Sequence, residues 1–138
     1  MVFVSFFSVC KTEKNIFIIN RISIGVQALN SSDLSFLGRR HTPLEALTAV
    51  EKAQEAVKRV SFDLIYGRPN QTTNAWAAEL ESALSVGTEH LSLYQLTIER
   101  GTTFFSSYKK GNFCLPDEEK ATQMFKITDE VCSKAGLK

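Results

Sequence analysis

The chain has 138 residues, 43% of them hydrophobic, which is the size and composition of about one globular domain with a core of its own. Sixteen basic residues are scattered among fifteen acidic ones, and a net charge of +1 gives no electrostatic footprint for nucleic acid or an anionic membrane. The three cysteines, Cys10, Cys114 and Cys132, form no Cys-x-x-Cys pair, which favours a reducing, cytoplasmic setting over a disulfide scaffold.

Residues 1–19 fit no clear period. The segment from Met1 to Val9 is apolar and aromatic, but no basic residue precedes it and it is too short to span a bilayer. We therefore interpret it as a strand-like or disordered lead-in rather than as a secretory signal.

Residues 16–27 predict a strand, because apolar residues alternate with small or polar ones at Ile22, Ile24 and Val26. A short helix is expected over residues 30–37, with Ser31 or Ser32 as its cap and Gly38 as its end.

A second helix should begin at Thr42, where a capping box coincides with a proline at the first helical position. It extends to about Lys58, and its predicted apolar stripe is Leu44, Leu47, Val50, Ala53 or Gln54, and Val57.

The next strand, residues 60–66, carries a carboxylate in an apolar setting. One predicted face is Val60, Phe62, Leu64 and Tyr66, and the other is Ser61, Asp63 and Ile65. Gly67 and Pro69 then end the strand. Because an isolated buried carboxylate is costly, Asp63 needs a neutralising neighbour or a polar ligand cavity.

A third helix is expected from Thr72 or Thr73 to Gly87, with an inward side of Ala75, Trp76, Leu80, Ala83 and Leu84. A third strand over residues 90–98 is followed by a long loop rich in Gly, Thr, Ser and Lys. Residues 115–119 start a last helix that ends at Gly136, with one side formed by Met124, Phe125, Thr128, Val131 and Ala135.

Alternating strands and helices predict an α/β fold of right-handed crossovers onto a parallel sheet. Each predicted strand keeps a polar side, whereas buried parallel strands are usually apolar on both faces. This favours a partial barrel with a polar lumen over a doubly wound sheet. Three strands cannot close a barrel, so we expect a piece of a larger one.

In βα folds the ligand lies at the carboxyl ends of the strands, which singles out Gln27, Gly67 and Thr97. Gln27 offers a donor and an acceptor for a nucleoside or amino-acid group, or it is a structural amide that bonds a loop. Arg39 and Arg40 either complement the preceding helix end or lie in solvent, and Arg39 could instead clamp a carboxylate.

Asp63 either forms a buried pair with such an arginine or accepts from a cationic ligand. The segment GRPNQT, residues 67–72, lacks the pattern of a phosphate loop and is interpreted as a turn with a helix cap. His41 and His90 are too isolated to predict a metal site, and Tyr94 and Trp76 are interpreted as packing residues.

Five segments together resemble the radical S-adenosylmethionine family of oxygen-independent coproporphyrinogen III oxidase-like proteins: NRISIGVQ (20–27), LGRRH (37–41), DLIYGRPNQT (63–72), HLSLYQLTIE (90–99) and LPDEE (115–119). The second and fourth are most similar to the heme-chaperone (HemW-type) branch. The resemblance covers residues 20–138 and implies part of a six-stranded (β/α) TIM-like barrel that holds S-adenosylmethionine against a [4Fe-4S] cluster.

By this resemblance, Gln27, Arg39, Asp63 and Thr97 match positions that contact S-adenosylmethionine, Thr97 through its backbone amide. The family's Cys-x-x-x-Cys-x-x-Cys cluster loop is absent from this sequence. We therefore expect an unmatched segment over residues 1–19 and the C-terminal half of a radical barrel over residues 20–138. We also expect that the fragment alone has no catalytic residue or metal ligand and is catalytically inactive.

For the intact relative, the resemblance implies radical oxidoreductase chemistry or heme carriage in porphyrin metabolism, with S-adenosylmethionine and porphyrin or heme as its small-molecule partners. The alternatives for this chain are a non-enzymatic remnant that binds S-adenosylmethionine or heme, with association through its exposed strand edges, and an inert product.

Overall fold

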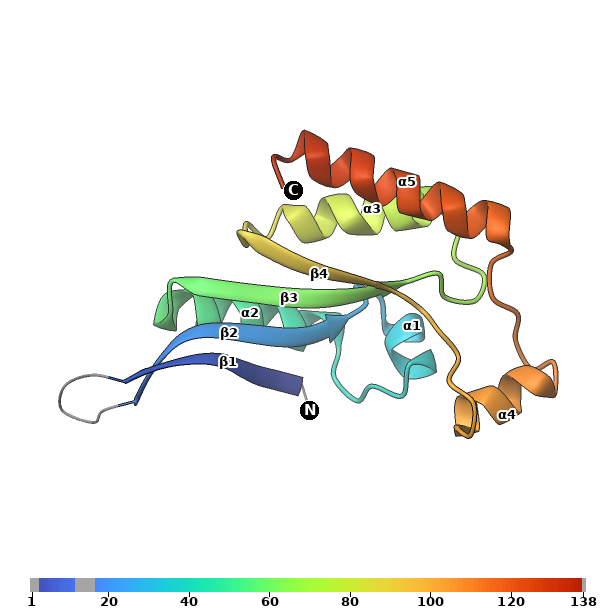
Figure 1. Cartoon of the computed structure of the whole chain (residues 1–138), viewed down its shortest axis with the longest axis horizontal. Helices are drawn as coiled ribbons and strands as arrows, with labels where there is room; N and C mark the ends of the chain where they lie inside the picture. Colours follow the sequence, from blue (N-terminus) through green and yellow to red (C-terminus); the bar gives the residue numbers. More distant parts are fainter. Residues whose placement is uncertain (1–2, 12–16, 138) are drawn as a thin grey trace. The chain divides into compact units, whose positions relative to one another are not determined.

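The computed structural model describes residues 3–11 and 17–137, with side chains from Ile19 onward, as four strands and five helices. In chain order they are β1 (Phe3–Lys11), β2 (Phe17–Gln27), α1 (Ser31–Phe36), α2 (Pro43–Ala56), β3 (Arg59–Tyr66), α3 (Thr73–Leu84), β4 (His90–Gln95), α4 (Thr103–Lys109) and α5 (Glu118–Lys134) (Figure 1). The strands form one sheet in the order β1-β2-β3-β4.

The chain divides into two compact units, Met1–Leu64 with Ser85–Leu93, and Ile65–Leu84 with Tyr94–Lys138. In the first unit β2 and β3 run parallel, which confirms the predicted crossover between them. β1 pairs with β2 in the antiparallel sense, so the lead-in is strand-like from Phe3 to Lys11. Residues 1–2 and 12–16 lie outside the described part.

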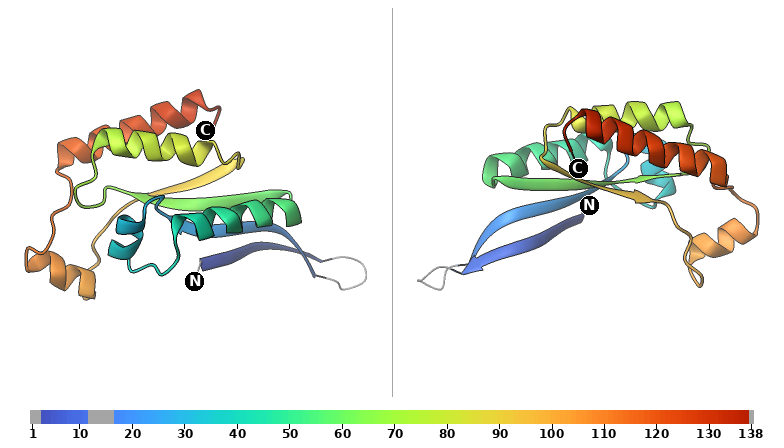
Figure 2. Two further views of the ribbon diagram at one scale, coloured as in Figure 1. Left: turned by 180° about the vertical axis from the view of Figure 1, so that it is seen from behind. Right: turned by 45° about the horizontal axis from the view of Figure 1, so that its top comes forward.

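Helix α2 lies along one face of β2 (Figures 1 and 2). Its capping box is present: Thr42 Oγ1 accepts from the Glu45 N–H at 3.2 Å, and the Glu45 carboxylate accepts from the Thr42 N–H at 2.7 Å. The predicted apolar stripe is partly wrong, because Leu44 is 74% exposed. The residues of α2 that are buried are Ala46, Val50 and Ala53, so the helix presents its small side chains to the core.

The cap predicted for α1 is also wrong by one residue. Asn30 takes the cap position, and its side-chain oxygen accepts from the Asp33 N–H at 2.8 Å. The core of the first unit is completed by apolar residues of the two parallel strands and α1, namely Ile24, Val26, Leu34, Val60, Phe62 and Leu64.

In the second unit α3 and α5 lie side by side (Figures 1 and 2). Trp76 is fully buried between them and the end of β3: its ring stacks on Tyr66 with centroids 5.1 Å apart, and its Nε1 donates to Thr128 Oγ1 at 2.8 Å. The interpretation of Trp76 as a packing residue is confirmed. The other buried residues of these two helices are Leu80, Ala83 and Met124.

Four predictions for residues 90–134 are wrong. Phe125 is 63% exposed, so it does not share the buried side of α5 with Met124. Tyr94 is 57% exposed and is therefore not a packing residue. β4 ends at Gln95, before residue 98. The predicted long loop contains helix α4, which Thr102 caps by accepting from the Phe105 N–H at 3.1 Å.

The loop after β3 is a turn with a helix cap, as predicted. Gly67 has a φ of +74°, which favours glycine, and its N–H donates to Gln71 Oε1 at 2.8 Å. Thr72 Oγ1 accepts from the Ala75 N–H at 3.1 Å and so begins α3. Arg68 is buried in this loop and forms a two-point ion pair with Glu79 of α3, an anchor that the sequence did not indicate.

Within the described residues, no helix combines the length and the hydrophobicity needed to cross a membrane. The same part of the chain contains no group of three or more His, Cys, Asp or Glu side chains arranged to hold a metal ion.

Candidate functional site

Strand β2 ends in a strained residue. The pairing of β2 with β3 shifts between Gly25 and Gln27, and Gln27 has a φ of +73°, a region that non-glycine residues rarely adopt. The Ala28 N–H donates to the Val26 carbonyl oxygen at 3.0 Å, which closes a tight three-residue turn centred on Gln27. Such strain persists where the surrounding structure determines it, and it clusters at functional sites.

The side chain of Gln27 forms hydrogen bonds with the carboxylate of Asp63 and the guanidinium of Arg39. Its Nε2 donates to Asp63 Oδ2 at 2.5 Å, and its Oε1 accepts from Arg39 NH2 at 3.0 Å. Asp63 is half-buried on β3, where it lies opposite Gly25 of β2, and Arg39 lies between α1 and α2. The structure therefore brings together three of the four residues predicted from the sequence.

Burial raises the pKa of Asp63 above its ordinary value, although the hydrogen bond from Gln27 and the positive charge of Arg39 both oppose this rise. The hydrogen bond from Gln27 and the charge of Arg39 therefore do not fully offset the cost of burying the Asp63 carboxylate. A carboxylate has room for several donors, so a cationic group of a ligand would complete its coordination.

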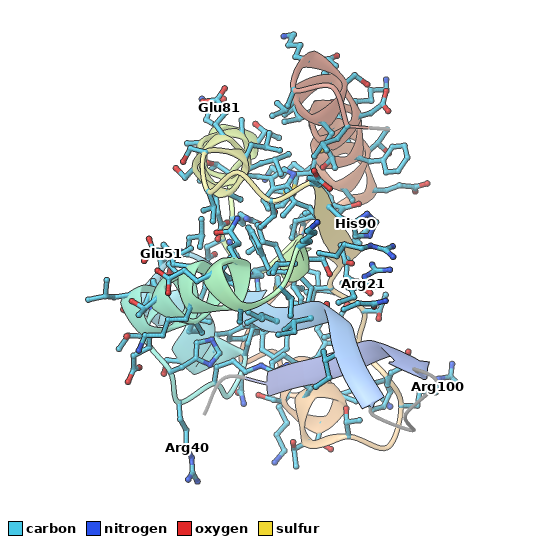
Figure 3. All side chains as sticks on the ribbon, turned by 90° about the vertical axis from the view of Figure 1, so that its left-hand side faces the viewer. Arg21, Arg40, Glu51, Glu81, His90 and Arg100 are labelled. Atoms are coloured by element: carbon cyan, nitrogen blue, oxygen red, sulfur yellow. The ribbon has the colours of Figure 1, made fainter. Side chains whose placement is uncertain are left out.

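Arg39 contributes more than a solvated charge. Its Nε is buried and has no hydrogen-bond partner among the described residues. The neighbouring Arg40 is exposed, and its side chain extends away from the molecule (Figure 3). Of the two arginines, only Arg39 contacts the cluster of Gln27 and Asp63.

Thr97 belongs to the second unit, and it lies two residues beyond the end of β4 with an exposed side chain. The sequence-based assignment placed it within a strand, which is wrong. The proposed use of its backbone amide stays a prediction.

One residue beside the cluster was set aside by the sequence reasoning. His41 is only 5% exposed, and its Nε2 lies 3.1 Å from the Val26 carbonyl oxygen. Sequence reasoning considered this histidine only as a metal ligand. Its distance of two residues from Arg39 is the signal that could have linked it to the cluster.

Several curated proteins are similar to this sequence over most of its length. Radical S-adenosyl methionine domain-containing protein 1, mitochondrial, of Danio rerio is 40% identical over 120 residues, which are 86% of this chain and 27% of that protein. Heme chaperone HemW of Lactococcus lactis is 34% identical over 119 residues, 86% of this chain and 31% of that protein. The chain thus spans about a quarter to a third of the length of these relatives. No family model matches the sequence.

Solved structures share the fold. The coproporphyrinogen III oxidase HemN of Escherichia coli, described as a radical SAM enzyme, matches 86% of this chain and 27% of its own with a TM-score of 0.72 at 24% identity. Elp3 of the archaeon Methanocaldococcus infernus matches 79% of this chain and 26% of its own with a TM-score of 0.69 at 19% identity.

These likenesses confirm the predicted α/β class and the partial radical S-adenosylmethionine barrel. Together with the sequence relatives, they show that the chain is similar to part of several radical S-adenosylmethionine proteins and heme chaperones and shares the fold of a coproporphyrinogen III oxidase.

Proposed function

We propose that this chain forms part of the S-adenosylmethionine site of a coproporphyrinogen III oxidase-like protein that acts in heme or porphyrin metabolism. The named functions of similar proteins, a heme chaperone and a coproporphyrinogen III oxidase, support the metabolic assignment. Residues 20–138 would be the C-terminal half of the barrel domain, and Gln27, Arg39, Asp63 and Thr97 would contact the cofactor.

The observation that carries this proposal is the strained Gln27, held between a half-buried carboxylate and a guanidinium whose buried Nε has no hydrogen-bond partner in the described part of the chain. S-adenosylmethionine presents an ammonium group, a carboxylate and a nucleoside. Asp63 can accept from the ammonium, Arg39 can donate to the carboxylate, and the amide of Gln27 can serve either group. The donors and acceptors present therefore fit the cofactor.

In this family S-adenosylmethionine supplies radical chemistry when it is bound with a [4Fe-4S] cluster. The residues of this chain do not fit that cluster, because its cysteines stand at positions 10, 114 and 132 without the Cys-x-x-x-Cys-x-x-Cys spacing. We propose that the chain alone binds the cofactor without performing the chemistry. Anaerobic reconstitution with iron and sulfide should leave it without cluster absorbance, and a near-stoichiometric cluster would refute this.

Heme binding and a cytoplasmic location are further proposals for the intact protein. A heme chaperone among the relatives favours the first. For the second, the scattered cysteines favour a reducing compartment, while the zebrafish and bovine relatives are named as mitochondrial.

Equilibrium dialysis with radiolabelled S-adenosylmethionine tests the site. The unchanged chain should bind, and Gln27→Ala and Asp63→Ala should each abolish or strongly weaken binding. Arg39→Ala should do the same, whereas Arg40→Ala is the matched control because the adjacent side chain is exposed. Binding that is equal in the Gln27 and Asp63 variants and the unchanged chain would rule out this site.

A further inference from the structure

We infer that His41 is a positioning residue of the proposed S-adenosylmethionine site, which it serves by fixing the turn that aims the Gln27 side chain. This inference rests on the proposed function. We call residues 26–28 the Gln27 turn.

The Val26 carbonyl oxygen is the acceptor that closes the Gln27 turn. It accepts from the Ala28 N–H at 3.0 Å and lies 3.1 Å from His41 Nε2. A carbonyl oxygen only accepts, so the hydrogen of this contact belongs to His41 Nε2. The same oxygen therefore receives one hydrogen bond from within the turn and one from outside it.

The Gln27 turn needs an outside tether because of its backbone conformation. A three-residue turn with a φ of +73° at a non-glycine residue is rare and strained, and it persists where other contacts determine it. Val26, Ala28 and Gln27 are at most 6% exposed, so water cannot readily replace the contact that His41 makes.

Residues 39–41 hold the Gln27 turn at two points. Arg39 NH2 donates to the Gln27 side chain, and His41 contacts the backbone one residue earlier. The segment is fixed immediately afterwards by the capping box at Thr42 that begins α2. One short segment thus sets both the backbone and the side chain of the residue that donates to Asp63.

The imidazole of His41 makes no second hydrogen bond to a described residue. Its Nδ1 is buried without a hydrogen-bond partner there, and the residue is 5% exposed. An apolar side chain would fill such a place without leaving a nitrogen unpaired. Its bond to Val26 is therefore the feature that distinguishes histidine from a packing residue at this position.

The test compares two substitutions in the full chain. His41→Leu removes the donor, and His41→Gln keeps an amide donor of comparable reach. His41→Leu should weaken S-adenosylmethionine binding by about tenfold in equilibrium dialysis, as expected for one lost hydrogen bond, and His41→Gln should restore most of it. Val50→Ala is the control for a general loss of stability, since Val50 is a buried residue of α2 in the same unit.

The route through Gln27 is tested in the Gln27→Ala background, where His41→Leu should cause no further loss of any residual binding. An NMR spectrum of the free chain gives a readout without ligand: the Gln27 side-chain amide and the Ala28 N–H should shift in His41→Leu and return toward their original positions in His41→Gln. If the unchanged chain does not bind, the proposed function fails, and the NMR comparison still decides whether His41 fixes the turn.

Normal binding by His41→Leu, or equal losses in His41→Leu, His41→Gln and Val50→Ala, would overturn the inference while leaving the proposed function in place. Unmoved Gln27 and Ala28 resonances in His41→Leu would overturn it as well.

Discussion

Replacing Glu79 by leucine should destabilise the chain severely. Arg68 is 1% exposed, the Glu79 side chain is 9% exposed, and the two form a two-point ion pair with Arg68 NH1 3.2 Å from Glu79 Oε1. Gln71 Nε2 also donates to Glu79 at 3.2 Å. Removing the acid takes the Glu79 charge away from a buried guanidinium, which costs about 3–5 kcal/mol of the free energy of unfolding.

Urea unfolding followed by fluorescence measures this loss, because Trp76 is the single tryptophan, is fully buried and lies on the same helix as Glu79. The midpoint should fall by roughly 2 M for a slope of about 2 kcal/mol per molar urea. The matched control is Glu81→Leu on the exposed side of α3, which should change stability by no more than about 0.5 kcal/mol (Figure 3).

A double variant, Arg68→Met with Glu79→Leu, removes both charges and should recover much of the loss. Equal, small effects of Glu79→Leu and Glu81→Leu would refute the argument that this ion pair anchors the loop after β3.

Three further predictions concern pH and packing. Burial raises the pKa of Asp63, so the folded chain keeps the Asp63 carboxyl protonated to a higher pH than the unfolded chain does. The free energy of unfolding should therefore rise as pH falls through the raised pKa toward 3.8, the ordinary pKa of an aspartate. Asp63→Asn should remove this rise in urea titrations at several pH values. Hydrogen bonds from Thr42 lower the pKa of Glu45, so the ionised Glu45 carboxylate stabilises the folded chain above pH 4.5, its ordinary pKa, and this stabilisation is lost as pH falls through the lowered pKa. Thr42→Ala should reduce stability by about 1 kcal/mol at neutral pH in thermal unfolding and abolish this pH dependence. Trp76→Phe should lose the bond to Thr128 and some packing, about 1–3 kcal/mol by calorimetry, and a neutral result would contradict the buried bond.

Strong local signals made much of the fold predictable. The capping box at Thr42 located the start of α2, and the alternation around Asp63 gave both faces of β3. Where adjacent residues are chemically equivalent, the sequence could not choose between them. Asn30, Ser31 and Ser32 are all good caps, and only the structure shows which side chain reaches the Asp33 N–H.

Burial on the helices was less predictable because tertiary contacts decide it. Met124 and Phe125 are both apolar neighbours on α5, but only Met124 is buried. Helix α4 was missed because its Thr, Ser, Phe and Tyr residues are mediocre helix formers, although the Thr102 cap was a usable signal.

The cluster of Gln27, Arg39 and Asp63 was predictable residue by residue, but its connections were not. Strand ends and a buried carboxylate marked Gln27 and Asp63, whereas the contribution of Arg39 depends on the path of the chain between α1 and α2. The positive φ of Gln27 and the contact from His41 leave no local pattern in the sequence, since glycine is the residue expected there.

A crystal structure of the chain with S-adenosylmethionine tests the central claim most directly. We predict ligand density beside the side chains of Gln27, Arg39 and Asp63. The ammonium group should lie near Asp63 and the carboxylate near the Arg39 guanidinium, and Gln27 should keep its positive φ. Ligand density at another place, or no ligand density beside these three side chains at saturating ligand, would contradict the assignment of these residues to the cofactor.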